Sequence, residues 1–312
     1  MRAAFALVGV LVAGASSADE PPALADLLAQ TGKYIRGLQQ DFATVISDET
    51  YTQRERFSEQ RSGKEKTSTA ERTMRSEMLF LWLPQEREWL AVRNVLSVDR
   101  KAVPDSKTRL DQMLANPEPD AIARFRNLRD EGARFNIGRL RRNLSDPMLP
   151  LKFIDPAYQP RFEFRYAGAD VINGIGVWKV ALTERQQRPT MIQVDEHDVP
   201  SAGIVWMTSS GIVMRTQLTL TDPKTRVNVS MLVSYGRDPK LGGWVPIRMD
   251  EEYTQHVDEA AVAPLMAQGT GDKTLTPRRF ALDHPFHEAI SCSATYTNYR
   301  RFETAARMLA PK

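Results

Sequence analysis

The sequence contains a single cysteine, Cys292, among 312 residues. One cysteine cannot form an intramolecular disulfide, so packing and hydrogen bonds must hold the fold together. The residue lies in the alternating stretch AISCSATY, which carries no histidine and no basic side chain that would activate a thiol. We therefore expect Cys292 to be a packed strand residue and not a reactive group.

Histidine is scarce as well, with four residues in the chain. His284 and His287 are three positions apart, a spacing that suits a metal on a helix, but Pro285 between them disfavours a regular helix. No second pair of candidate ligands accompanies them, so we expect neither a metal site nor any other cofactor.

Sequence motifs of enzymes are absent too. The chain contains no G-x-S-x-G, no P-loop and no H-E-x-x-H. We therefore predict that it is not an enzyme. One catalytic alternative stays open, a hydrolase with a dispersed site that uses His197 in the stretch VDEHD. Such a stretch is also typical of a solvated turn between strands.

Neither sign of charge dominates, since 42 lysines and arginines balance 39 acidic residues to a formal net charge of +3. This balance does not indicate nucleic acid as a partner. The exception is local, because seven arginines lie between residues 124 and 142. A charge run of this kind is usually a solvated face, but it also suits contact with a polyanion, an anionic lipid or a protein partner. The candidate contact residues are Arg139, Arg141 and Arg142.

Long apolar runs are missing except at the N-terminus. Arg2 is followed by AAFALVGVLVAGASSA, an apolar run of roughly a dozen residues, whereas a bilayer span needs about 20. The charge, the apolar core and the small residues at its end predict a signal peptide over residues 1–18. No cysteine follows that could carry a lipid. We expect residues 19–312 to form one domain that is soluble in the periplasm or secreted.

The mature chain is predicted to begin with a helix. Apolar residues recur at helical spacing over residues 22–42, which predicts an amphipathic helix of about five turns. The pattern then changes to alternation. Residues 43–98 contain three runs rich in Thr, Val and Tyr, typical of long antiparallel strands joined by hairpins. Residues 105–155 break the alternation and favour a helical segment that contains prolines.

The second half of the chain is predicted to be almost entirely strand. Short alternating runs over residues 161–255 are separated by turn sequences such as NGIG, SSG and TDPKT. Residues 256–288 are polar and too long for a hairpin, so we expect a long loop. Residues 289–302 form the final strand, which we expect to pair with the strand around residues 244–253.

These elements favour an α+β fold built on a large antiparallel sheet. Each strand has one apolar face, and no helix-length segment interrupts residues 200–255, which argues against a parallel α/β sheet. We expect a curved, half-barrel sheet with the N-terminal helix and the helical insertion packed over one face. Aromatic and apolar residues of the second half either fill the core or line an apolar ligand cavity. The candidate lining residues are Phe162, Phe164, Trp178, Val180, Trp206 and Met214.

The order of elements resembles a known family. The opening helix LADLLAQTGKYIRGLQQDFATV and the closing stretches GGWVPIRMDEEYTQ and ATYTNYRRFE are similar to those of the lipoprotein-carrier superfamily. This superfamily contains periplasmic outer-membrane lipoprotein chaperones and their sensor relatives, and the chain also resembles uncharacterised exported bacterial proteins of acidobacterial type. The resemblance covers most of the mature chain and implies an unclosed half-barrel with helices over its concave face, where the carriers hold acyl chains.

Two functional hypotheses follow. In the first, the chain is a periplasmic carrier that holds an acyl chain of a lipid or lipoprotein, or another apolar ligand, without catalysis, and makes at most peripheral contact with a membrane. In the second, it is an envelope scaffold or sensor that binds a partner or polyanion through the arginine-rich segment.

Overall fold

The computed structural model describes most of the chain after the predicted signal peptide. The described residues are 20–41, 44–61, 63–115, 120–140, 142, 144–194, 196–258 and 284–302. The predicted signal peptide, most of the predicted loop at 256–288 and the candidate residue Arg141 lie outside them.

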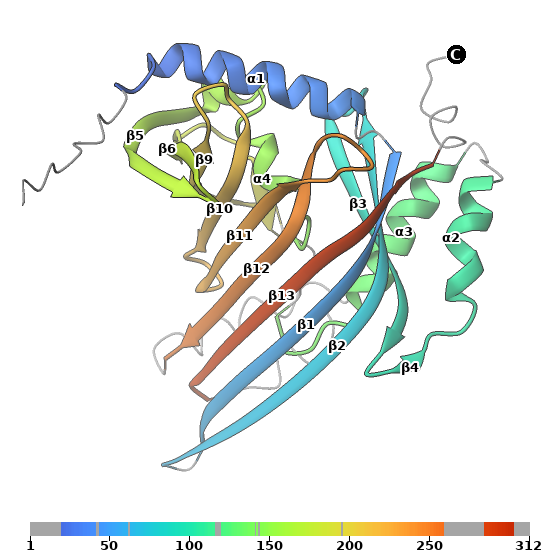
Figure 1. The fold of residues 1–312 in the computed structure, drawn as a ribbon. Helices are drawn as coiled ribbons and strands as arrows, with labels where there is room; N and C mark the ends of the chain where they lie inside the picture. Colours follow the sequence, from blue (N-terminus) through green and yellow to red (C-terminus); the bar gives the residue numbers. More distant parts are fainter. Residues whose placement is uncertain are drawn as a thin grey trace, which may run out of the picture.

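The predicted N-terminal helix is present as α1 (Leu24–Asp41). Its apolar stripe is covered, with Leu27 and Ile35 almost fully buried. The Thr31 hydroxyl lies 3.2 Å from the Met207 sulfur, which fixes the middle of the helix to the sheet. Figure 1 shows α1 lying across one end of the strands.

An 11-stranded antiparallel sheet dominates the structure, in the order β4-β3-β2-β1-β13-β12-β11-β10-β9-β6-β5 (Figure 1). This is the α+β half-barrel that the sequence predicts, with two unpaired edges. A separate hairpin consists of β7 (Ile192–Val194) and β8 (His197–Val199). The strands of the large sheet are β1 (Thr44–Arg61), β2 (Lys64–Leu83), β3 (Glu88–Val98), β4 (Lys101–Ala102), β5 (Phe162–Ile172), β6 (Ile175–Glu184), β9 (Ser201–Met207), β10 (Val213–Asp222), β11 (Val227–Arg237), β12 (Trp244–Val257) and β13 (Phe286–Arg301).

The last strand lies in the middle of the sheet. The predicted pairing of β13 with β12 is confirmed, for example between Ala294 and Met249. On its other side β13 pairs with β1, so that Ala294 also lies opposite Tyr51. The three long strands predicted over residues 43–98 are confirmed as β1, β2 and β3, each paired with the next.

The sheet curves around its main core. Apolar side chains from both ends of the sheet, such as Trp89 of β3 and Phe162 of β5, belong to one buried cluster. We call the face that carries this cluster the inner face and the opposite one the outer face. Because neighbouring residues of a strand point to opposite faces, Leu90 and Val92 of β3 lie on the outer face.

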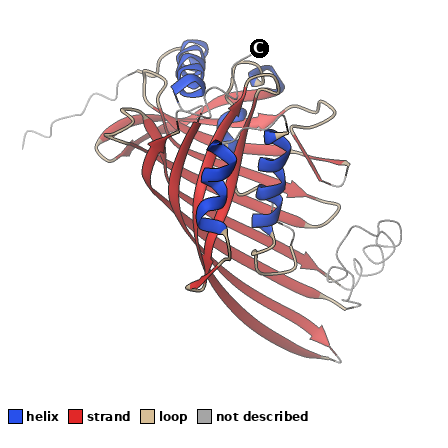
Figure 2. Cartoon of the chain, turned by 90° about the vertical axis from the view of Figure 1, so that its right-hand side faces the viewer, coloured by secondary structure: helices blue, strands red, loops and turns tan. Residues whose placement is uncertain are grey.

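The predicted helical insertion is divided between the two faces. Helices α2 (Ser106–Ala115) and α3 (Ala121–Ala133) pack on the outer face of β3 through Leu110, Phe125 and Leu128 (Figure 2). The chain then passes to the inner face, where the short helix α4 (Leu149–Lys152) is followed by the 3-10 turn η1 (Gln159–Arg161). The prediction of an insertion over a single face is therefore wrong, since each of its halves has its own apolar contacts.

No helix in the described part of the chain is both long and apolar enough to cross a bilayer.

Candidate ligand pocket at the inner face

The inner face of the half-barrel carries buried charges. Arg93 of β3 donates to both carboxylate oxygens of Glu49 of β1, at 2.6 and 2.8 Å. Its guanidinium lies 4.4 Å from the centre of the Tyr51 ring. Burial opposes the charge on Arg93, but the Glu49 carboxylate outweighs burial and holds the pKa of Arg93 well above its usual value. This bidentate pair joins β1 to β3 across β2.

Two tyrosines share a second buried carboxylate, that of Glu251 on β12. The Tyr51 hydroxyl donates to one oxygen at 2.8 Å and the Tyr253 hydroxyl to the other at 2.6 Å. The Ser145 hydroxyl donates to the same group at 3.2 Å. Burial, reinforced by the charge of Glu251, raises the pKa of both tyrosines well above the ordinary value of 10.0. These hydroxyls therefore stay protonated hydrogen-bond donors at neutral pH.

The described residues of the segment after α3, which are 134–140, 142 and 144–155, occupy the inside of the half-barrel. We call this part of the chain the inner segment. Arg72 of β2 donates to the Phe135 carbonyl at 2.8 Å, and Tyr235 of β11 donates to the Pro147 carbonyl at 3.0 Å. Its far end contributes Phe153 and Ile154 to the main core. The chain itself thus takes up space that an empty half-barrel would leave for a ligand.

The arginine-rich stretch is divided, because Arg126, Arg129 and Arg134 on or next to α3 are exposed to solvent whereas its C-terminal end is turned inward. Arg142 is 2 % exposed, and its guanidinium donates to the Ile137 carbonyl at 2.9 Å and the Cys292 sulfur at 2.7 Å. Arg139 is half-buried, with its guanidinium 4.4 Å from the centre of the Phe57 ring. The prediction of an external polyanion contact at Arg142 is wrong, because its side chain bonds inside the protein. The periodicity of the sequence could not reveal the burial of Arg142, because an irregular segment has no repeating pattern of apolar residues.

A pocket of about 220 Å³ lies between β3 and the inner segment. It has a charged rim and an apolar floor. Trp89, Ala91 and Met148 belong both to its lining and to the main core, so the floor is continuous with the core. The lining residues are Glu88, Trp89, Ala91, Arg129, Leu144, Ser145, Asp146, Met148, Leu149 and Lys152.

Asp146 is the unusual group of the pocket. One of its carboxylate oxygens accepts a hydrogen bond from the Met148 N–H at 2.8 Å. Burial raises the pKa of Asp146 to about 7, against the opposing effect of that N–H, and the charge of Glu88 adds to the rise. The pocket thus holds a carboxyl group that changes charge near neutral pH.

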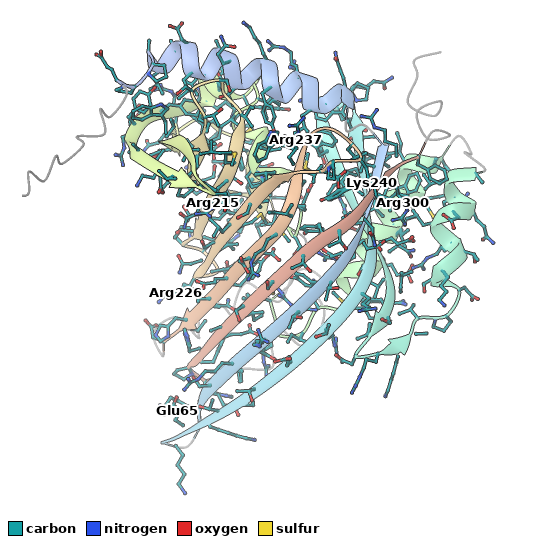
Figure 3. The ribbon with its side chains drawn as sticks, in the orientation of Figure 1. Glu65, Arg215, Arg226, Arg237, Lys240 and Arg300 are labelled. Carbon is teal, nitrogen blue, oxygen red and sulfur yellow. The ribbon has the colours of Figure 1, made fainter. Side chains whose placement is uncertain are left out.

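A second hollow, of about 520 Å³, lies on the outer face over β1, β2, β12 and β13. It is more open to solvent than the 220 Å³ pocket, and it carries an exposed ion pair between Arg54 and Glu71. Elsewhere on the surface, Glu65, Arg226 and Arg237 are exposed at strand ends (Figure 3). Exposed pairs contribute little binding or folding energy, so this hollow is the weaker candidate for a ligand.

The structure brings four of the six predicted lining residues together in or against the main core, and places the other two elsewhere. Phe162, Phe164 and Val180 pack in or against the main core, and the rings of Phe162 and Phe153 are 5.4 Å apart. Trp178 packs beside Tyr166, with ring centres 5.9 Å apart.

Trp206 and Met214 lie in a separate small cluster. The order of residues along β9 explains the position of Trp206, since its neighbours Val205 and Met207 point to the inner face. None of the six predicted residues lines the 220 Å³ pocket. The sequence signals for that pocket were Trp89 and the proline-fenced stretch DPMLPLKFIDP.

The hydrogen bonds of His197, the candidate residue of a dispersed hydrolase site, indicate a structural role. The His197 Nε2 lies 2.9 Å from the Asp222 carboxylate, which also accepts the Lys224 N–H at 2.9 Å. Nδ1 of the ring has no hydrogen-bond partner among the described residues. No described hydroxyl or thiol is therefore bonded to the ring as a nucleophile would be. The pair ties β8 to the turn after β10.

Two solved structures are among those that are similar to the chain. No family model matches the chain, and no curated protein matches it. One structure is a domain of Vibrio parahaemolyticus described as an outer membrane lipoprotein-sorting protein, with 8% identity, 90% of this chain and 99% of that chain covered, and a TM-score of 0.30. The other is a DUF1329 family protein of Desulfovibrio piger, with 9% identity, coverages of 90% and 94%, and a TM-score of 0.30.

Because identity and TM-score are this low, we argue function from the residues of this chain alone.

Proposed function

We propose that this chain is a non-catalytic binding protein for an amphiphile, and that the apolar part of the ligand enters the 220 Å³ pocket. The observation that supports this most is the continuity of the pocket floor with the main core. An apolar group that enters past the charged rim meets Trp89, Ala91 and Met148, which are buried side chains of that core. Such a combination of apolar floor and polar rim is typical of sites for small apolar ligands.

The size of the pocket limits how much of an acyl chain it can hold. Small-molecule sites usually measure about 300–1,000 Å³, so a pocket of about 220 Å³ receives one end of a chain. Burial contributes about 0.8 kcal/mol per methylene, so six methylenes give roughly 5 kcal/mol before the entropic cost of association. Retention of a whole acyl chain would require the inner segment to move away from the sheet.

The absence of catalysis is part of the proposal. Several buried ionisable groups of the inner face are paired with one another, as Arg93 is with Glu49 and the two tyrosines are with Glu251. Among the described residues, no cluster of three or more His, Cys, Asp or Glu side chains could hold a metal. Binding energy from an apolar chain needs no catalytic group.

We place this activity in the periplasm or outside the cell, because the N-terminal sequence has the charge, the apolar core and the small residues of a signal peptide. Contact with a membrane surface during ligand exchange belongs to the same proposal.

Filling the pocket tests the proposed function. In the Ala91→Leu variant the larger side chain occupies the floor, and we expect at least a tenfold loss of affinity for dodecyl maltoside, measured by isothermal titration calorimetry. The matched control is Ala102→Leu, at an exposed position of β4. Unchanged affinity in Ala91→Leu would show that the pocket is not the site. Failure of the unmodified protein to bind any alkyl ligand would overturn the function itself.

A further inference from the structure

A count of ion pairs at the pocket leaves one carboxylate without a cation. Lys152 Nζ lies 3.6 Å from the Glu88 carboxylate, and an Arg129 guanidinium nitrogen lies 3.0 Å from Asp130. Both basic side chains of the rim thus have an acidic partner. Within the described part of the chain, no cation lies within 4.0 Å of the Asp146 carboxylate, whose one hydrogen bond comes from the Met148 N–H.

We propose that the pocket binds a positively charged ammonium group that carries an apolar chain, with Asp146 as its counter-ion and Trp89 as its aromatic wall. This inference rests on the proposed function, because it assigns the head group of the amphiphile. An ammonium group supplies the charge and the N–H donors that the Asp146 carboxylate lacks. The adjacent chain continues onto the floor formed by Ala91 and Met148.

The aromatic wall favours the same charge. The indole of Trp89 lines the pocket, and its ring centre is 5.1 Å from that of Trp82, so the ring is held in place by its neighbour. Cations bind over the face of tryptophan more strongly than over other aromatic rings. A bound ammonium would therefore have a carboxylate and an indole in one site.

An anionic head group fits the rim less well. It would have to displace Glu88 from Lys152 or Asp130 from Arg129, and it would then lie beside the Asp146 carboxylate in the same small space. Two negative charges that share a small pocket partly shielded from water repel one another strongly. The Ser145 hydroxyl offers no compensation, because it donates its proton to Glu251.

The protonation of Asp146 gives a pH signature. Burial raises the pKa of Asp146 to about 7. The charged or titratable groups around it are Glu88 from β3, Arg129 from α3, Lys152 from α4 and Tyr235 from β11. Below that pH the carboxyl group becomes neutral and loses its attraction for a cation. The affinity for an ammonium ligand should therefore fall as the pH drops from 8 to 6, whereas that for an uncharged ligand should not.

The test compares ligands of one chain length. The purified full-length protein is titrated with dodecylammonium, dodecylphosphocholine, dodecyl maltoside and dodecyl sulfate below their micelle concentrations, at pH 8. We expect dodecylammonium to bind about tenfold more tightly than the maltoside, as one charge-assisted contact provides. Asp146→Asn should remove that preference and leave maltoside binding unchanged. The control Asp111→Asn removes one charge at an exposed position of α2.

The outcomes distinguish failure of the ammonium site from failure of the proposed amphiphile binding. Equal binding of the phosphocholine and the ammonium ligand supports the inference and identifies a zwitterionic lipid as the source of the cation. Preference for the sulfate, or equal affinity for all four ligands in both proteins, overturns the ammonium site and leaves the amphiphile function intact. Binding of none of the four overturns the proposed function. If Asp146→Asn does not fold, the pH dependence of the unmodified protein decides.

Discussion

Glu288 on the inner face shows how burial favours the neutral form of an ionisable side chain. Glu288 of β13 is fully buried, and one of its oxygens accepts the Arg139 N–H at 2.6 Å while the other has no hydrogen-bond partner among the described residues. Burial, together with the neighbouring Glu55, raises the pKa of Glu288 to about 7 from the ordinary value of 4.5. An ionised Glu288 therefore opposes folding.

This raised pKa predicts how stability depends on pH. Between about pH 4.5 and 7 the folded state holds a proton on Glu288 that the unfolded state has lost, so the free energy of unfolding falls as the pH rises. Glu288→Gln should remove that part of the slope and stabilise the protein at pH 8 by about 2 kcal/mol. Urea denaturation at pH 5 and pH 8 measures it.

The control for that measurement is Glu252→Gln, at an exposed position of the neighbouring strand β12, which should leave the slope as it is. A slope in Glu288→Gln as steep as in the unmodified protein would contradict the raised pKa.

Among the larger elements, the inner segment differs most from the sequence prediction. Helix α1 and the long strands were predictable because apolar residues recur in them with a fixed period. The inner segment has no such period, since its contacts are made by backbone carbonyls such as that of Phe135 and by isolated side chains such as Arg142. The burial of Arg142 could not be recognised in the sequence for this reason, and neither could the pocket beside the segment.

A glycine tests how closely the inner segment is packed on the sheet. Gly138 has φ = +86°, and a Cβ added there would lie 2.5 Å from the Cδ1 of Ile290. Gly138→Ala should lower the free energy of unfolding by the left-handed penalty of about 1 kcal/mol plus roughly 1–3 kcal/mol for the clash. Thermal or urea unfolding measures the difference.

Gly63→Ala is the matched control, because Gly63 has φ = +74° and open space around it, so only the backbone penalty applies. Adding Ile290→Val removes the Cδ1 methyl and should restore part of the stability lost in Gly138→Ala. Equal losses at both glycines would show that the segment is loosely packed at this point.

For the whole molecule, the sequence predicts an exported protein that loses residues 1–18 on processing. Expressed in a Gram-negative host, the chain should be recovered from the periplasm with the mass of residues 19–312, measured by intact-mass spectrometry. Replacing the apolar run at residues 5–12 with polar residues should keep the chain in the cytoplasm, because the apolar core of the signal is lost. Full-length mass in the periplasmic fraction would contradict cleavage after Ala18.

The central position of β13 determines when the half-barrel can close. The strands β4 to β1 form one meander and β12 to β5 another, and β13 is the strand that joins them. Asn298 of this strand donates to the Asp48 carboxylate at 2.9 Å, between residues 250 positions apart. Contacts over such distances slow folding, because the loop must close before the contact forms. A chain that emerges N-terminus first thus keeps the edges of β1 and β12 open, in addition to the two edges of the folded sheet, until β13 arrives, and remains vulnerable to mispairing for that interval.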